Sequence, residues 1–176
     1  MKKFLTLMIS IGILSCANNK TEQVSTIKIK DEKAQKISEM MQSYVNNNFD
    51  SSIISEDAKI KFNQLEMTKT DFENLVVTHH AMFSEISFPE GWMETVNYTG
   101  ADVKNAGGKY ADDYGSTWTS HWSDWTAVSK ISGDTISNHC FFGYKWENDK
   151  IVEVSAIFPD EAFNKELSMF MEANKK

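Results

Sequence analysis

The sequence predicts an α+β protein in which helices come first and a meander of antiparallel strands follows. Residues 31–47 and 68–86 carry apolar side chains at helical spacing, and three long alternating segments follow at about 116–130, 134–147 and 150–158. The helices are separated from these strands along the chain. This order favours α+β over a parallel doubly wound fold.

The two predicted helices have recognisable starting residues. Asp31 is a suitable N-cap for the first, in which apolar residues recur every three or four positions. The second begins at two overlapping capping boxes, Thr68-x-x-Asp71 and Thr70-x-x-Glu73. We expect it to continue to Ile86 and to end at Pro89-Glu90-Gly91.

The remaining elements are assigned from alternation and turn residues. Residues 59–63 and 92–99 are predicted strands, and the glycine-rich, acidic stretch 100–115 is a predicted loop. Ser132-Gly133 and Asn148-Asp149 stand where two-residue hairpin turns belong. A final amphipathic helix is predicted from Asp160.

The first fifteen residues have the pattern of a secretory signal peptide. Two lysines precede an apolar run of about eleven residues, too short for a membrane-spanning helix of roughly twenty. Ile13-Leu14-Ser15-Cys16 resembles the lipobox of bacterial lipoproteins, whose cysteine is lipidated. We therefore predict a signal peptide over 1–15, a flexible tether over 16–30 that begins with lipidated Cys16, and one domain over 31–174. The expected location is the bacterial cell envelope, outside the cytoplasm, with Cys16 holding the protein to a membrane.

Charge and cysteine content exclude several function classes. Removal of the signal takes two of 18 basic residues, which leaves 16 against 25 acidic residues and a net charge of about −9. The chain has no arginine, so we expect no nucleic-acid partner. With Cys16 lipidated, Cys140 has no cysteine to pair with. We also expect neither a cofactor nor a metal site.

The layout resembles the NTF2-like superfamily, and more narrowly the SnoaL-like proteins, over about residues 32–170. The resemblance rests on the two early helices, the 59–63 strand, the Met67–Phe72 helix start and the closing hairpin from Tyr144 to Val154. It implies a cone in which a curved antiparallel sheet wraps on the N-terminal helices, with a pocket at the open end. The superfamily includes isomerases, dehydratases, cyclases and binding proteins, so the fold leaves the activity open.

Strand alternation predicts which residues line that pocket. The apolar set Val152, Val154, Ala156 and Phe158 marks the inner face of the last strand. Counting through the two predicted turns places these further residues on the same face: Trp118, Trp122, Asp124, Thr126, His139 and Phe141. A one-residue slip or bulge would reverse this assignment.

Asp124 and His139 are the candidate catalytic residues under this register. A carboxylate among tryptophans loses hydration, which raises its pKa, and a nearby histidine could share its proton. Trp118, Trp122, Phe141, Thr126 and His79 of the second helix are the candidate ligand contacts. The alternatives are a solvated carboxylate at the rim and histidines satisfied within the core.

Three functions follow from these assignments. The first is a binding domain for a small, partly apolar ligand. The second is a cofactor-independent isomerase, dehydratase or cyclase that uses Asp124 and His139 as an acid/base pair. The third is an interaction module that forms a homodimer through the outer sheet face, where the same register places Trp125, Phe142, Tyr144 and Trp146.

Overall fold

The computed structural model describes residues 25–89 and 91–175. Its helices are α1 (Glu32–Val45), α2 (Lys69–Met82), α3 (Ala101–Ala106), α4 (Gly108–Asp112) and α5 (Glu161–Ala173). Its strands are β1 (Thr26–Ile29), β2 (Ile54–Phe62), β3 (Leu65–Met67), β4 (Phe83–Ser87), β5 (Gly91–Asn97), β6 (Thr117–Ser129), β7 (Thr135–Glu147) and β8 (Lys150–Ile157).

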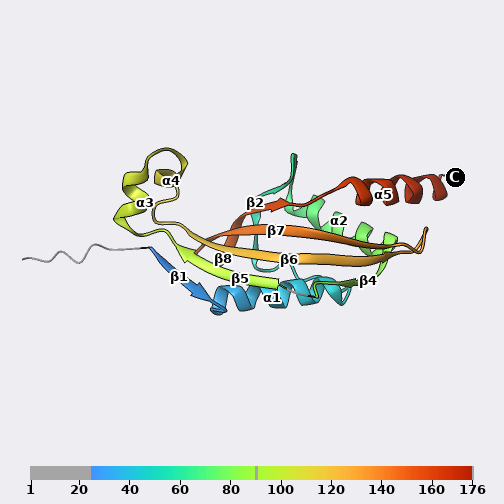
Figure 1. The fold of residues 1–176 in the computed structure, drawn as a ribbon, viewed down its shortest axis with the longest axis horizontal. Coiled ribbons are helices and arrows are strands. Elements are labelled where there is room, and N and C mark those ends of the chain that lie inside the picture. Colours follow the sequence, from blue (N-terminus) through green and yellow to red (C-terminus); the bar gives the residue numbers. More distant parts are fainter. Residues whose placement is uncertain (1–24, 90, 176) are drawn as a thin grey trace, which may run out of the picture.

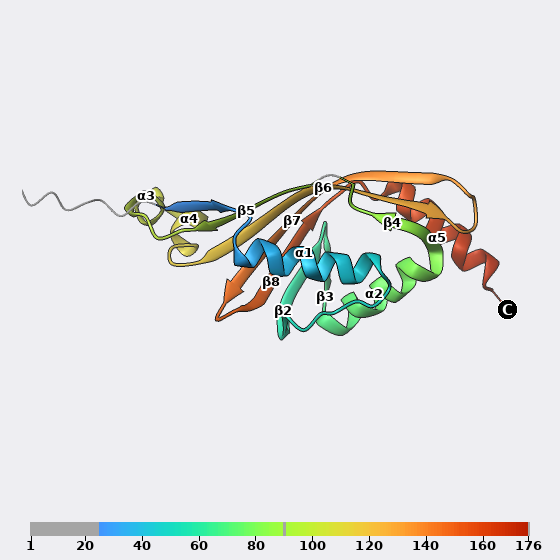
Figure 2. The same ribbon diagram turned by 90° about the horizontal axis from the view of Figure 1, so that it is seen from below.

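In this part of the chain, the strands form one curved sheet in the order β1-β5-β6-β7-β8-β2-β3, and β4 pairs with β6 (Figure 1). Helices α1 and α2 lie on the same side of the sheet (Figure 2). The predicted α+β class and cone are confirmed. The sheet is mixed rather than wholly antiparallel, because β2 runs parallel to β8.

Local sequence explains where α1 and α2 begin. The Asp31 carboxylate accepts a hydrogen bond of 3.0 Å from the backbone N–H of Ala34, which caps α1. Thr68 and Asp71 form the predicted capping box at the start of α2. Both helix starts are therefore confirmed.

The predicted end of α2 is wrong. The helix stops at Met82, and the next residues form β4, in which Phe83 pairs with Ser129 of β6. Phe83 and Ile86 are buried by this pairing rather than on a helical stripe. Pairing with β6 thus overrides a helical pattern that continues in the sequence.

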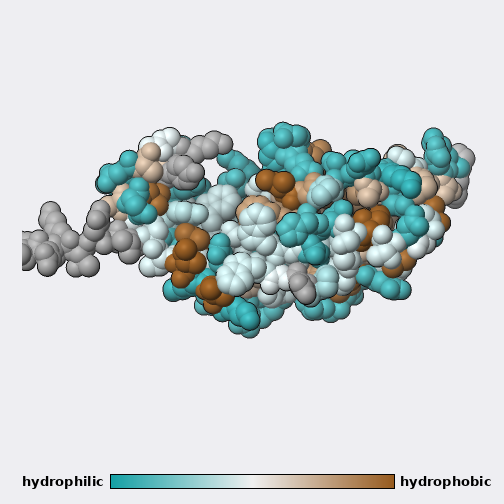
Figure 3. Space-filling model, viewed as in Figure 1, coloured by the Kyte–Doolittle hydropathy of each residue, from teal (hydrophilic) through white to brown (hydrophobic). Residues whose placement is uncertain are grey.

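The predicted leader lies outside the described residues, and so do Cys16 and most of the tether. The flexible tether was predicted to extend to residue 30, but Thr26–Ile29 already form β1 and pair with β5. No described helix is long and apolar enough to cross a membrane. In Figure 3, apolar residues gather on the surface near β1, where Ile27 is 64% exposed.

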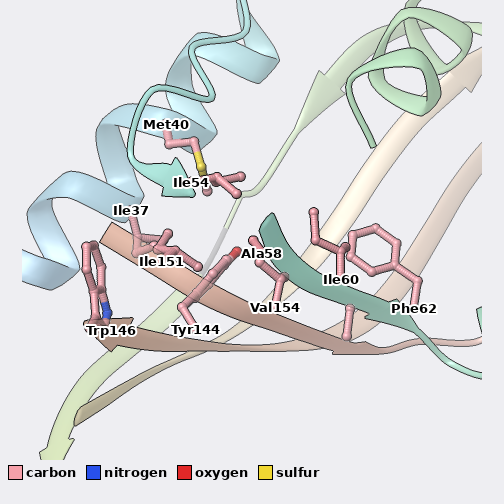
Figure 4. Packing of buried hydrophobic residues seen from close by; sticks show 11 residues of the cluster. Ile37, Met40, Ile54, Ala58, Ile60, Phe62, Tyr144, Trp146, Ile151 and Val154 are labelled. Atoms are coloured by element: carbon pink, nitrogen blue, oxygen red, sulfur yellow. The ribbon is translucent and has the colours of Figure 1, made fainter. Parts of the chain in front are cut away.

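Two apolar clusters fill the space between the helices and the sheet. The first joins Ile37 and Met40 of α1 to β2, β7 and β8, and its side chains interlock in Figure 4. The second joins Val76 of α2 to Trp125 and Ala127 of β6, and α5 packs against it. The two clusters hold the helices against one sheet face, which is the inner face of the cone.

A β-bulge at Val152 decides which side chains reach that inner face. Glu147 pairs with Lys150 across the predicted Asn148-Asp149 turn, but Tyr144 then pairs with Val154, and Val152 has no partner. Val154 and Ala156 are buried, so the inner face of β8 was predicted correctly. Because β8 contains this one extra residue, the pairing of β7 with β8 differs by one position from the predicted register. The side chains of β6 and β7 that were predicted to face inward therefore face outward, and those predicted to face outward face inward.

The β6–β7 hairpin differs from prediction in another way. Its loop runs from Lys130 to Asp134 instead of the two-residue turn Ser132-Gly133, and Val128 pairs with Thr135. Glu166 of α5 is buried beneath the loop and accepts hydrogen bonds from the Ser129 and Ser132 hydroxyls. This loop shifts the β6–β7 register by two residues, which leaves the faces unchanged.

Candidate ligand-binding cavity

A cavity of about 200 Å³ lies between α1, α2 and the inner face of the sheet. Its wall is mainly methionine, leucine, valine and aromatic side chains. Exposed Leu65 and Asp160 mark its rim, where the chain leads into α5. The lining residues most important for its chemistry are Tyr44, His79, Trp125, Asn138, Cys140 and Tyr144.

A hydrogen-bonded relay crosses one wall of this cavity. The Trp125 indole N–H donates to the Tyr44 hydroxyl over 2.9 Å. The same hydroxyl lies 2.9 Å from Nδ1 of His79. An indole nitrogen can only donate, so the Tyr44 oxygen accepts from Trp125 and its proton goes to His79. The relay connects β6, α1 and α2.

This relay fixes the tautomer of His79. Burial lowers its pKa to about 4, so the ring is neutral near neutral pH. Because Nδ1 accepts from Tyr44, Nε2 carries the proton of the neutral ring. Within the described chain, no side chain or carbonyl accepts from Nε2. His79 thus offers one donor to a ligand.

Asn138 adds an uncommitted amide to the same wall. It lies on β7 directly opposite Trp125, is 7% exposed and lines the cavity. Its side chain makes no hydrogen bond to any described residue. A buried amide normally has partners, so this one is free to bind a polar atom of a ligand.

Two further polar groups in the wall are inert by comparison. The Cys140 thiol donates to the carbonyl of Ser123 over 3.1 Å, and burial raises its pKa to about 11. Burial also raises the pKa of Tyr144 above its usual value. Both groups therefore stay protonated near neutral pH and act as part of the wall.

The predicted catalytic pair forms, but outside the cavity. Asp124 and His139 face each other across β6 and β7, with 2.7 Å between Oδ1 and Nδ1. Their side chains are 46% and 72% exposed. The predicted placement in the pocket is wrong because of the bulge at Val152, and the pair lies on the outer face.

The same reversal applies to the predicted sheet contacts. Trp122 is 46% exposed and packs on Phe141, with 4.5 Å between ring centroids, on the outer face. Thr126 bonds to Ser87 there, and Trp118 lies over Gly143 with Lys145 near its ring. None of these described residues lines the cavity. Of the predicted ligand contacts, His79 is placed in it.

The residues predicted for an outer dimer surface are correspondingly inside. Trp125, Tyr144 and Trp146 are each less than 10% exposed, and Phe142 lines the cavity. Tyr44, Trp125 and Asn138 line the cavity but were not predicted as site residues. The helical stripe of α1 includes Tyr44 and could have indicated it, whereas Trp125 and Asn138 depended on the bulge.

Comparisons with known proteins show the fold. No family model matches the chain, and no curated protein matches its sequence. AclR of Streptomyces galilaeus, a proposed hydroxylase, is 14% identical with a TM-score of 0.52, over 78% of this chain and 96% of that chain. An NTF2-like protein of unknown function from Burkholderia pseudomallei is 9% identical with a TM-score of 0.52, over 78% and 98%.

A third similar structure, a proposed polyketide cyclase from Silicibacter, is 8% identical with a TM-score of 0.50, over 76% of this chain and 93% of that chain. At these identities the likeness concerns the fold alone. The chain therefore has the NTF2-like fold that the sequence resemblance implied.

Proposed function

We propose that this protein is a lipid-anchored, extracytoplasmic domain that binds a small, mostly apolar ligand in the cavity between α1, α2 and the sheet. The observation that carries the proposal is the contrast within the wall. An extensive apolar lining surrounds a few polar groups, among which His79 and Asn138 have hydrogen-bonding capacity left over. Ligand sites in proteins commonly combine such a lining with a few convergent polar groups.

The polar groups suggest which ligands fit. His79 offers a donor through Nε2, and the Asn138 amide offers both a donor and an acceptor. Among the described lining residues, Asp160 at the exposed rim is the one carboxylate. A ligand with an aromatic or aliphatic body and one carbonyl or hydroxyl group suits this wall.

The test is binding of an apolar fluorescent probe, aminoanthracene, to two variants on the same helix. Leu75 lines the cavity, whereas Val77 is 68% exposed. We expect Leu75→Trp to fill the cavity and weaken binding at least about tenfold, which corresponds to about 1.4 kcal/mol. Val77→Trp should leave binding unchanged. Equal binding by both variants would place the probe elsewhere and refute the proposal.

The lipid anchor is a separate part of the proposal and rests on the Ile13–Cys16 motif. We expect the wild-type protein to incorporate an alkyne-tagged fatty acid in a bacterial host and to fractionate with membranes. Cys16→Ala should lose the label, and Cys140→Ala should keep it. Labelling that survives Cys16→Ala would reject lipidation at this residue.

Proton-transfer catalysis is the second candidate, and the Tyr44–His79 pair and the fold shared with a proposed cyclase favour it. Asp124 and His139 cannot serve a ligand in the cavity from the outer face, so His79 would have to act. A histidine with a pKa near 4 is a weak base at neutral pH, which ranks this candidate below binding. Recovery of a bound ligand in altered form would reverse the ranking.

A homodimer through the outer sheet face is the third candidate, with different residues from those predicted. Trp92, Trp122, Phe141 and Ile157 are paired in register across β5, β6, β7 and β8. Three of them, Trp92, Trp122 and Ile157, are about half exposed or more. A second copy could bury this stripe. We expect Trp122→Lys to convert a dimer to a monomer in light scattering; a monomeric wild-type protein would refute the dimer.

A further inference from the structure

A second compartment lies on the other side of α1, between that helix and strands β5 and β6. Its volume is about 600 Å³. Its lining is mixed, and it is more polar than that of the main cavity. Its polar members include Gln35, Ser38 and Gln42 of α1, which are exposed like Lys30 at the open side, together with the buried His121 and Ser123.

His121 is the unusual member of this lining. It is 2% exposed, and its Nδ1 is buried without a hydrogen-bond partner among the described residues. The ring stacks on Phe142 with 6.0 Å between centroids, and Phe88 lies 5.8 Å away on another side. Burial of a polar nitrogen without a partner costs roughly 1–3 kcal/mol, so a histidine kept here points to a missing partner.

The two compartments share part of their walls. Met41 of α1 and Phe88, which lies between β4 and β5, line both. Phe88 also contacts Tyr44 of the relay, with 6.0 Å between ring centroids. Phe88 belongs to neither strand, so its backbone is not held in place by strand pairing. Met41 and Phe88 are therefore the side chains through which the two linings meet.

We propose that the second compartment receives the hydroxyl-bearing end of an amphipathic ligand whose apolar end occupies the main cavity, and that His121 binds this hydroxyl group. The inference rests on the proposed binding function and extends it to a ligand class. A hydroxyl both donates and accepts, so it can pair with His121 in either neutral tautomer. The ligand would pass between Met41 and Phe88, and the apolar and polar linings would each meet matching chemistry.

The test uses two competitors of the same carbon skeleton against bound aminoanthracene. One is butylbenzene, and the other is the matched diol, in which two hydroxyl groups end the same butyl chain. We expect His121→Phe, which keeps a ring between Phe88 and Phe142, to weaken the diol about tenfold and to leave butylbenzene unchanged. His121→Asn, which retains hydrogen-bonding groups, should recover most of the loss. His139→Phe on the outer face is the matched control and should change neither competitor.

The outcomes separate the two proposals. Binding of butylbenzene with no loss of diol affinity in His121→Phe would overturn the amphipathic ligand and leave the cavity proposal intact. Displacement of the probe by neither competitor, in the wild-type protein, would overturn both. Equal weakening of the two competitors by His121→Phe would show a structural role for this histidine and would also reject the inference.

Discussion

The Tyr44 hydroxyl lies 2.9 Å from Nδ1 of His79, and this hydrogen bond joins α1 to α2 at the wall of the main cavity. The same oxygen accepts from Trp125 of the sheet. One hydroxyl thus connects three elements that surround the candidate site. Its position makes the stability of the cone and the polarity of the cavity depend on the same side chain.

Replacement of Tyr44 tests this relay directly. Tyr44→Phe keeps the ring but leaves the Trp125 N–H and His79 Nδ1 without their partner, so we expect a loss of about 2 kcal/mol in the free energy of unfolding. Urea denaturation followed by circular dichroism measures it. Tyr114→Phe is the control, because Tyr114 is 45% exposed and should cost little. A loss of the same size in both variants would contradict the relay.

Acid should destabilise the fold through two buried histidines. Burial lowers the pKa of both His79 and His121 from 6.5 to about 4. The unfolded chain then binds protons more tightly than the folded one, so stability is complete above about pH 6.5 and falls as the pH drops toward 4. Each histidine should cost about 2 kcal/mol by about pH 5.

Urea titrations across this range, with His121→Phe as the comparison, isolate one of the two contributions. The variant should lose about half of the pH dependence that these two residues produce. It should also be at least as stable as the wild-type protein near neutral pH, because it removes a buried nitrogen that has no partner. An unchanged pH slope in His121→Phe would show that this histidine is not buried in solution.

Cys140 should be unreactive in the folded protein. Its side chain is 2% exposed and its pKa is raised to about 11, so little thiolate forms near neutral pH. The experiment uses the Cys16→Ala variant, so that Cys140 is the one cysteine left in the sequence. A thiol-specific reagent should modify Cys140 only after this variant is denatured. Fast modification under native conditions would mean that the cavity wall opens at β7.

The outer pair of Asp124 and His139 should not affect the cavity. The double variant Asp124→Asn, His139→Ala should bind aminoanthracene within about twofold of wild type, and its stability should fall by no more than about 1 kcal/mol, because exposed ion pairs contribute little. His79→Phe is the comparison, since it changes the wall itself. A large loss of binding in the double variant would require a ligand site on the outer face.

The sequence was sufficient for features that are set by short-range chemistry. The caps at Asp31 and Thr68 and the Asn148-Asp149 turn depend on a few adjacent residues, and all three were predicted correctly. In the turn, both residues have positive φ values, 45° and 65°, which asparagine and aspartate tolerate better than most residues.

The candidate site required information that adjacent residues do not contain. The apolar alternation of β8 identified the correct inner face, but one unpaired residue, Val152, reversed the faces of β6 and β7. A bulge is set by how the sheet curves over the helices, so alternation along a strand does not reveal it. The position of β4 is similar, because Phe83 leaves a helical pattern to pair with Ser129.

The location of β1 has a consequence for how a tethered copy would meet its ligand. The described chain starts with β1 at one end of the long axis, and α5, beside the cavity rim, lies toward the other end (Figures 1 and 2). The tether of the proposed anchor would therefore join the domain at the β1 end, so a ligand would reach the cavity rim at the end away from that attachment.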